Sequence, residues 1–187
     1  MAKSKLEEAL EKYLTGNLEL RAGIFETAKY PDGTPVAHVA YINEYGATIE
    51  QQARTGTIYR RLKKDGSFAR GGKFVKAKSS NFATQHDIAE HTINIPPRPF
   101  FRKVVNDGRS TWSAILATSI KQDKGDIRKS LARLGKIIDN ELKASVLAWS
   151  DPPNAKSTIA QKGFNKPLVD DGDLSKSFEY EVIDDQG

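Results

Sequence analysis

Histidines and clustered acidic residues are the side chains of this sequence whose types and spacing could support metal binding or acid–base chemistry. His86 and His91 close the segment HDIAEH, but they are five residues apart, so on a helix their side chains would diverge by about 140°. The segment DDGD (Asp170–Asp173) resembles a fragment of a calcium loop, but it lacks the alternating acidic frame and the distal glutamate. We therefore interpret the two histidines as surface residues of a return loop, and Asp170–Asp173 as a turn with a helix-capping aspartate.

The sequence lacks the common motifs of catalytic sites. It contains no G-x-S-x-G, no G-x-G-x-x-G and no Walker loop, and cysteine is absent. The absence of cysteine excludes disulfides, thiol catalysis and zinc–thiolate sites. The paired carboxylates of Glu7 and Glu8 fall on the solvated face of a predicted helix. We therefore expect a protein that is not an enzyme and that uses no metal or cofactor.

Basic residues are concentrated in one segment, Arg54–Lys78. It holds nine lysines and arginines against one acidic residue, Asp65, for a net charge of +8; the whole chain carries +5, which leaves −3 for the remainder. Tyr59, Phe68 and Phe74 interleave with the cations, as in proteins that bind single-stranded nucleic acid, although aromatic residues of a hairpin also brace each other across strands. The segment is either a solvated hairpin that protects a sheet edge or a contact surface for a partner subunit or a phosphate backbone. Its charge exceeds what edge protection requires, so we favour the contact surface.

Length and hydropathy are those of a single domain of ordinary size. The chain has 187 residues, of which 38% are apolar and 28% charged. No stretch approaches the roughly 18–20 apolar residues that a membrane span needs. The first residues, Met1–Ser4, lead directly into a charged amphipathic segment, unlike a secretory signal. We expect a protein made in a cytoplasm, with no membrane among its partners.

Periodicity in the first 47 residues predicts a helix, a strand and a second helix. Ser4 suits the N-cap of a helix whose apolar positions continue to Leu14. Leu18–Ile24 alternates between apolar and polar residues, as a half-buried strand does. Pro35–Tyr45 has proline at its start and Gly46 after its end, which favours a short helix. The β-branched and aromatic residues of this last segment leave a strand open.

The segment from Ala47 to Ile95 is predicted to be mainly β structure, and much of it is too polar to be buried on either face. We expect residues 53–90 to form an extended basic hairpin, inserted into a single domain of residues 1–187 and projecting from it. The expected elements are a strand at Thr57–Lys63, a hairpin turn at Asp65–Gly66, a break at Gly71–Gly72, a strand at Phe74–Ala77, a loose return at Ser79–Glu90, and a strand at Thr92–Ile95 that rejoins the main sheet.

The apolar period changes from two to 3.6 after residue 100, which indicates helices. Apolar residues from Phe101 to Leu116 form one stripe with Gly108 inside it; either another helix approaches closely there, or the helix breaks at Asn106–Gly108. A second helix buries a face from Ile127 to Leu142, and the last strand lies at Phe178–Val182. The predicted fold class is α+β, with a mixed or antiparallel sheet packed against two long helices.

A cluster of prolines separates the β segment from the first long helix. Pro96–Pro99 contains the P-x-x-P pattern with a cation that SH3 ligands share, but such ligands occupy exposed stretches. Pro97 cannot donate to a sheet ladder, and Pro99 suits the first turn of a helix. Phe100 and Phe101 then begin the buried stripe. We interpret the cluster as a rigid corner between strand and helix.

Three segments together form a pattern that covers most of the chain outside residues 53–90. VAYINEYGATI (Val39–Ile49) is similar to Y-A-x-I-x-E-F-G, and IPPRPFFRKV (Ile95–Val104) is similar to I-P-A-R-P-F followed by a helix. PPNAKSTIAQKGFNKPLVDDGDLSKSF (Pro152–Phe178) is similar to P-N-x-x-x-T-I-x-x-K-G-x-x-x-P-L-x-D-T-G-x-L-x-x-S. In this order and spacing the segments resemble the tail-completion or neck proteins of tailed bacteriophages, also called minor tail or virion morphogenesis proteins. The departures are Pro97 for alanine and Asp171 for threonine, both compatible with the same turns.

This resemblance implies a structural virion protein rather than a catalyst. It implies a homo-oligomeric ring, usually a hexamer, that acts as a connector at the neck or tail end, completes the tail and mediates head–tail joining around the DNA channel. The implied partners are further copies of the chain, other phage neck and tail proteins, and DNA in the lumen bound without sequence specificity. Assembly would take place in the bacterial host cytoplasm. The basic hairpin looks like an elaboration, so the resemblance does not supply its role.

Two sets of residues follow as predictions. The set expected to contact a neighbouring subunit or DNA is Arg60, Arg61, Lys63, Lys64, Arg70, Lys73 and Lys76. The set expected to shape corners and turns is Pro97, Pro99, Phe100, Gly163 and Gly172. The alternative function is a stand-alone nucleic-acid-binding protein whose basic hairpin grips phosphates.

Overall fold

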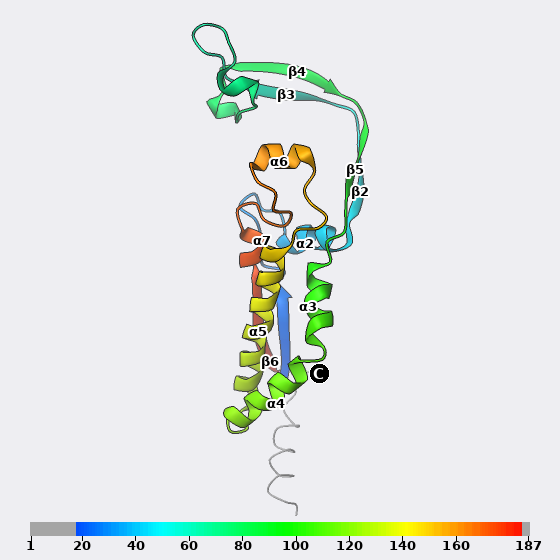
Figure 1. The fold of residues 1–187 in the computed structure, drawn as a ribbon, viewed down its shortest axis with the longest axis vertical. Helices are drawn as coiled ribbons and strands as arrows, with labels where there is room; N and C mark the ends of the chain where they lie inside the picture. Colours follow the sequence, from blue (N-terminus) through cyan, green and yellow to red (C-terminus); the bar gives the residue numbers. More distant parts are fainter. Residues whose placement is uncertain (1–17, 185–187) are drawn as a thin grey trace, which may run out of the picture. The chain divides into compact units, whose positions relative to one another are not determined.

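The protein has an α+β fold, as predicted. The computed structural model describes residues 18–184 (Figure 1), so the helix predicted from Ser4 onward lies outside the described residues. The chain divides into two compact units. We call residues 18–47 and 95–184 the body, and Thr48–Asn94 the insert.

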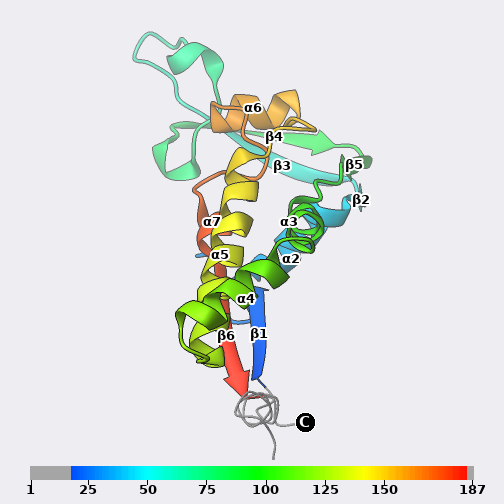
Figure 2. The ribbon, with the colours of Figure 1, turned by 60° about the horizontal axis from the view of Figure 1, so that its bottom comes forward.

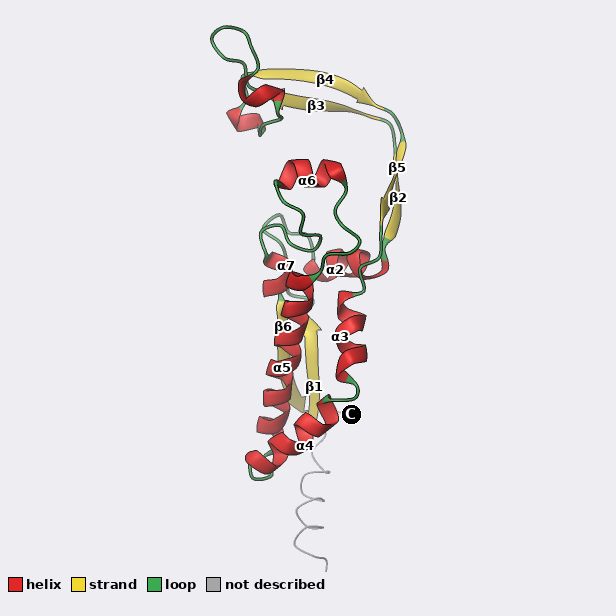
Figure 3. Ribbon diagram, in the orientation of Figure 1, coloured by secondary structure: helices red, strands yellow, loops and turns green. Residues whose placement is uncertain are grey.

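The strands pair two by two. The body is built from β1 (Leu18–Ile24), α2 (Val36–Tyr45), α3 (Phe100–Gly108), α4 (Trp112–Gln122), α5 (Ile127–Ala148), α6 (Lys156–Lys162), α7 (Asp173–Lys176) and β6 (Phe178–Asp184). The insert is built from β2 (Ala47–Gln51), β3 (Arg54–Arg60), the short 3-10 helices η1 (Ala69–Gly72) and η2 (Ala77–Ser79), β4 (Phe82–Ile88) and β5 (His91–Ile95). The first residue of β2 and the last residue of β5 belong to the body. β1 pairs with β6, β2 with β5 and β3 with β4 (Figure 3). The described chain therefore has three two-stranded sheets in place of one larger sheet.

The core of the body is built around α5, which packs on the antiparallel pair of β1 and β6 (Figures 1 and 2), and buried residues of α2, α3 and α7 complete it. Alternate residues on the paired strands are apolar, so one face of the pair packs on the helix. At Gly135 of α5 a Cβ atom would lie 2.4 Å from the Tyr180 ring and 2.7 Å from the Leu20 side chain. The missing side chain therefore lets the helix approach the strands closely.

The stripe from Phe101 to Leu116 belongs to two helices, so the prediction of a single long helix was wrong. α3 ends at Gly108, and the chain turns before α4 begins at Trp112. The indole of Trp112 covers Gly108, where a Cβ atom would lie 2.0 Å from the ring. Its Nε1 donates a hydrogen bond of 3.0 Å to Glu141 of α5. A break occurs as in the second alternative, but at Arg109–Thr111 and not at Asn106–Gly108, which is still helical.

Two short helices lie in the tail, where only turns and a strand were predicted. Gly163 follows α6 with φ 84°, and Gly172 precedes α7 with φ 82°. Both lie in the left-handed region, which favours glycine. The N-cap of α7 is Gly172 and no side chain caps the helix, so the predicted capping aspartate was wrong. Asp173 instead lies in the first turn, where a negative charge stabilises the helix dipole.

The insert differs from the prediction in three places. Ser79–Glu90 was expected as a loose return, but Phe82–Ile88 forms β4 and pairs with β3 from Arg60↔Phe82 to Arg54↔Ile88. Phe74–Ala77 was expected as a strand and forms none. β5 was expected to join the main sheet of the domain, but among the described residues it pairs with β2 alone. In each case pairing between distant residues, rather than local apolar content, decides which polar segment becomes a strand.

A buried carboxylate joins the end of α2 to the start of α3. Glu44 is 5% exposed, and its carboxylate accepts hydrogen bonds from the backbone N–H groups of Phe101 (2.9 Å) and Arg102 (3.1 Å). The first N–H groups of a helix have no partner within it, so Glu44 caps α3 from another helix. The Arg102 side chain completes the arrangement, with Nε 2.8 Å from the carboxylate and an NH2 group that donates to the Glu44 carbonyl.

Arg98 is buried beside this cap and links three parts of the body. Its backbone N–H donates to the Asn43 carbonyl (2.7 Å), and its guanidinium donates to the Asn43 side chain (3.2 Å) and to the Pro152 carbonyl (3.3 Å). Burial lowers the pKa of the Arg98 guanidinium. Gly46 has φ 77°, and a Cβ atom there would lie 2.8 Å from the Ile95 carbonyl oxygen. The chain segments on either side of the insert therefore run in close contact.

The residues of the predicted corner lie in this region. Pro97 is placed between β5 and α3, and Pro99 occupies the N-cap position of α3. Phe100 is 1% exposed and packs edge to face on Phe178, with the ring centroids 6.2 Å apart. Because the cation of the P-x-x-P pattern is the buried Arg98, the segment does not present an SH3-type ligand.

We expect Glu44→Ala to lower the free energy of unfolding by about 2–3 kcal/mol, because two N–H groups of α3 and the Arg102 guanidinium lose a charged acceptor. Glu44→Gln keeps one acceptor oxygen and should cost about half as much. Urea denaturation followed by circular dichroism measures both changes. Glu26→Ala, an exposed glutamate after β1, is the matched control and should change the free energy by less than about 0.5 kcal/mol. A cost for Glu44→Ala no larger than that of the control would contradict the capping role.

Candidate interaction site on the basic tip of the insert

Residues 60–81 form a folded tip at the end of the β3–β4 pair, which we call the basic tip. Its first loop turns at Asp65–Gly66, as predicted, with Lys63 N–H donating to the Ser67 carbonyl (2.8 Å) and Leu62 bridging to Phe68. The Asp65 carboxylate accepts hydrogen bonds from the hydroxyl and N–H of Ser67. These bonds hold the pKa of Asp65 below its ordinary value. The only acidic residue of the segment Arg54–Lys78 is thus hydrogen-bonded within the turn.

The second loop of the basic tip returns to β3. Arg70 and Gly71 have φ values of 55° and 63°, and this left-handed pair reverses the chain. The N–H of Val75 then donates to the Tyr59 carbonyl (2.9 Å). Asn81 closes the tip by donating to the Leu62 carbonyl (2.9 Å) and accepting from the Leu62 N–H (2.7 Å). The basic tip is therefore a defined structure and not an open hairpin end.

Arg60 lies inside the basic tip, with its guanidinium 5.2 Å from the ring centroids of both Phe68 and Phe74. Phe68 also meets Phe82 edge to face at 5.8 Å. Arg60 is only partly exposed, and its Nε has no hydrogen-bond partner. Because each aromatic face attracts the cation, Arg60 joins the two loops. The structure thus gives this member of the predicted contact set an internal role.

The other six members of the predicted contact set are exposed on the basic tip. They are Arg61, Lys63, Lys64, Arg70, Lys73 and Lys76. Within residues 18–184, none of these cations forms an ion pair. Like charges held this close repel each other, and an anionic partner would relieve that repulsion.

Phe74 is the feature of this surface that the predicted set omits. Its side chain is 67% exposed although one ring face contacts Arg60. Phe68 is 40% exposed beside it. Both phenylalanines were visible in the sequence as aromatics interleaved with cations, but periodicity could not show which would be left uncovered. The surface is therefore cationic and also includes exposed apolar rings.

The candidate metal ligands are not brought together. His86 lies on β4 with Nε2 2.8 Å from the Thr84 hydroxyl, and His91 lies on β5 with Nδ1 3.0 Å from the Ala89 carbonyl. Over the described part of the chain, no group of three or more potential ligands is arranged to hold a metal ion. Within the same range, no helix is long and apolar enough to cross a membrane.

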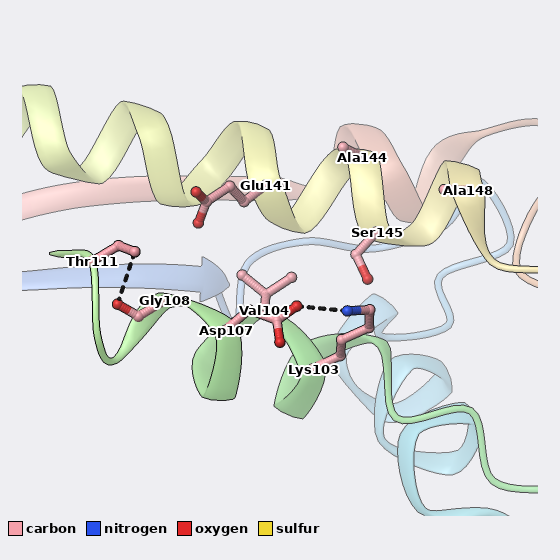
Figure 4. A pocket seen from close by; sticks show the side chains of 9 residues that line it. All are labelled: Lys103, Val104, Asp107, Gly108, Thr111, Glu141, Ala144, Ser145 and Ala148. Carbon is pink, nitrogen blue, oxygen red and sulfur yellow. Dashed lines mark hydrogen bonds and ion pairs between the residues drawn. The ribbon is translucent and has the colours of Figure 1, made fainter.

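A groove of about 380 Å³ between α3 and α5 is shown in Figure 4. Its polar side chains already have partners inside the protein. Lys103 pairs with Asp107 at 2.6 Å, Ser145 donates to the Phe100 carbonyl, and Glu141 accepts from the Trp112 indole. Each of these polar groups therefore already serves a bond within the body.

Comparisons with protein-family models, with curated protein sequences and with solved structures found no match to this chain. The functional conclusion therefore rests on the sequence segments described above and on the geometry of the body and the basic tip.

We expect Arg60→Ala to loosen the basic tip without unfolding the body. Removing a cation from two aromatic faces costs about 1–2 kcal/mol, so the exchange protection of the Val75 amide should fall about 5–30-fold. Hydrogen exchange resolved to single amides measures this. Arg61→Ala removes a neighbouring exposed cation and should leave the Val75 amide unchanged. Equal effects of the two variants would show that Arg60 has no internal role.

Proposed function

We propose that this protein is a structural component of a tailed-bacteriophage virion. In this proposal it forms a homo-oligomeric ring, a hexamer by family resemblance, at the neck or tail end, where it completes the tail and joins it to the head around the DNA channel. Its location is then the virion, after assembly in the host cytoplasm. Its partners are further copies of itself and other neck and tail proteins, with DNA passing through the lumen.

One observation carries the proposal: the three segments that resemble the family meet through side-chain bonds. Asn43 and Glu44 belong to the first segment, Arg98 to the second and Pro152 to the third. Arg98 bonds to both Asn43 and Pro152, and Glu44 caps the helix that the second segment starts. A family pattern whose members bond to each other in the fold is better support than three separate short matches.

The described surface offers a charged tip suited to association. Its six exposed cations form no ion pair within residues 18–184, and this free positive charge supports a role in binding other molecules.

The basic tip favours a second candidate function, non-specific nucleic-acid binding by the isolated chain. Six exposed cations without ion partners in the described chain and the exposed Phe74 ring are features of surfaces that hold phosphates and stack on bases. If each cation neutralised one phosphate, the logarithm of the binding constant would fall with a slope of about −5 against the logarithm of salt concentration.

The two functions are separated by measuring assembly and duplex binding on the full-length chain. We expect native mass spectrometry and particle images to show a closed ring, alone or with tail proteins, and fluorescence anisotropy to show weak duplex binding. A variant with Arg61, Lys64 and Lys73 replaced by glutamine controls for binding through the basic tip. Nanomolar duplex binding by a monomer with a slope near −5, lost in this variant, would instead establish the nucleic-acid-binding function.

A further inference from the structure

A second groove of the body, of about 380 Å³, has an apolar floor and an acidic rim; we call it the acidic groove. Val39 of α2, Leu168 and Leu174 form the floor. Four carboxylates, from Asp32, Asp170, Asp171 and Asp173, stand around it. The acidic groove therefore combines an apolar surface with negative charge, which suits an occupant that is both apolar and cationic.

The negative charge of the acidic groove is only partly balanced within the body. Asp173 lies 3.5 Å from the Lys176 ammonium group, and Lys162 at the groove wall donates to the carbonyls of Lys166 and Val169. Among the described residues, Asp170 and Asp171 have no ion pair. The rim therefore keeps a net negative charge that a cationic partner would neutralise.

Tyr30 also lines the acidic groove, and the pKa of its hydroxyl responds to the same negative charges. Burial raises the pKa of its hydroxyl, and the charges of Asp173 and Asp32 raise it further. A neutral phenol is thus favoured in the groove, and the surrounding field would attract cations.

The basic tip of this chain has the matching surface. Phe74 is 67% exposed, and Lys73 and Lys76 flank it in the sequence with exposed side chains and no ion partner in the described range. This short stretch of chain therefore offers an exposed aromatic ring together with two exposed cations. That arrangement is complementary to an apolar floor between carboxylates, whereas a phosphate backbone would leave the floor unused.

We propose that the basic tip of one copy docks into the acidic groove of a second copy, with Phe74 on the apolar floor and Lys73 and Lys76 facing Asp170 and Asp171. The contact joins two different surfaces of the same chain, so it is heterologous and repeats from copy to copy until a ring closes or a filament grows. The proposal rests on the ring function above and names the contact between its subunits.

Two charge-reversed variants of the full-length chain test the docking. The tip variant carries Lys73→Glu and Lys76→Glu, and the groove variant carries Asp170→Lys and Asp171→Lys. Each alone brings like charges together, so we expect the concentration needed for assembly to rise about tenfold or more. Mixed in equal amounts, the two variants offer an opposite charge at every junction and should assemble alternately at nearly the wild-type concentration. Sedimentation velocity and native mass spectrometry measure both the size and the composition of the assembly.

Three further variants test whether the effect is specific to the tip and the groove. Lys121→Glu with Lys136→Glu reverses two exposed lysines of α4 and α5 and should assemble as the wild type does. Phe74→Ala changes no charge and should still weaken assembly several-fold. A chain that carries all four reversals should assemble by itself, because its tip and groove are again complementary. Circular dichroism and thermal melting check that each variant is folded.

Several outcomes would overturn the docking. If the mixture fails to assemble while the chain with four reversals succeeds, the tip binds the groove of its own chain. If the tip variant loses duplex binding but assembles normally, the tip serves nucleic acid. A ring that forms regardless of these substitutions would overturn the docking alone, whereas wild-type protein that never self-associates or joins a particle would overturn the proposed function as well.

Discussion

The fold of the body depends on one buried carboxylate. Glu44 belongs to the last turn of α2, and it supplies the acceptor that the first N–H groups of α3 lack. The two helices are thereby fixed end to end at the place where the chain leaves for the insert and returns from it. Arg98 adds bonds to Asn43 and to the Pro152 carbonyl, so the tail of the chain is tied to the same point. A buried polar group is stable only when such partners are present, and here the partners of Glu44 and Arg98 are distant in the chain.

Charge is distributed differently in the two units. The insert carries the cations of the basic tip, and the body carries the aspartates of the acidic groove. Desolvating a charge without a partner is costly, and these side chains therefore lie at the surface of the unit that bears them. Arg60 is the exception, since its guanidinium lies 5.2 Å from the ring centroids of both Phe68 and Phe74 and is only partly exposed.

Much of the body could be predicted from the sequence, and much of the insert could not. The strand at Leu18–Ile24 and the long helix from Ile127 follow clear apolar periods, and the helix at Val36–Tyr45 follows from the proline before it and the glycine after it. The insert has few apolar residues, so its period does not distinguish a strand from a loop. Phe82–Ile88 becomes a strand because β3 supplies hydrogen bonds along its whole length. The break after Gly108 depends likewise on the contact of the Trp112 ring with Gly108. The sequence did not show this contact, because its apolar pattern fits both a continuous and a broken helix.

The sequence by itself determined the α+β class, the position of the cationic segment, the proline corner and the three segments that resemble a phage family. These are local properties, because charge, turn chemistry and apolar period are read from neighbouring residues. Only the tertiary structure decided that Glu44 caps a helix that starts far along the chain, with its bond to Phe101 spanning 57 residues. It also decided that Arg98 is buried, that the Arg60 guanidinium lies near two phenylalanine rings, and that Asp32 and Asp170 line the same groove. These are contacts between residues distant in the chain, and no local pattern specifies which distant group will supply the missing partner.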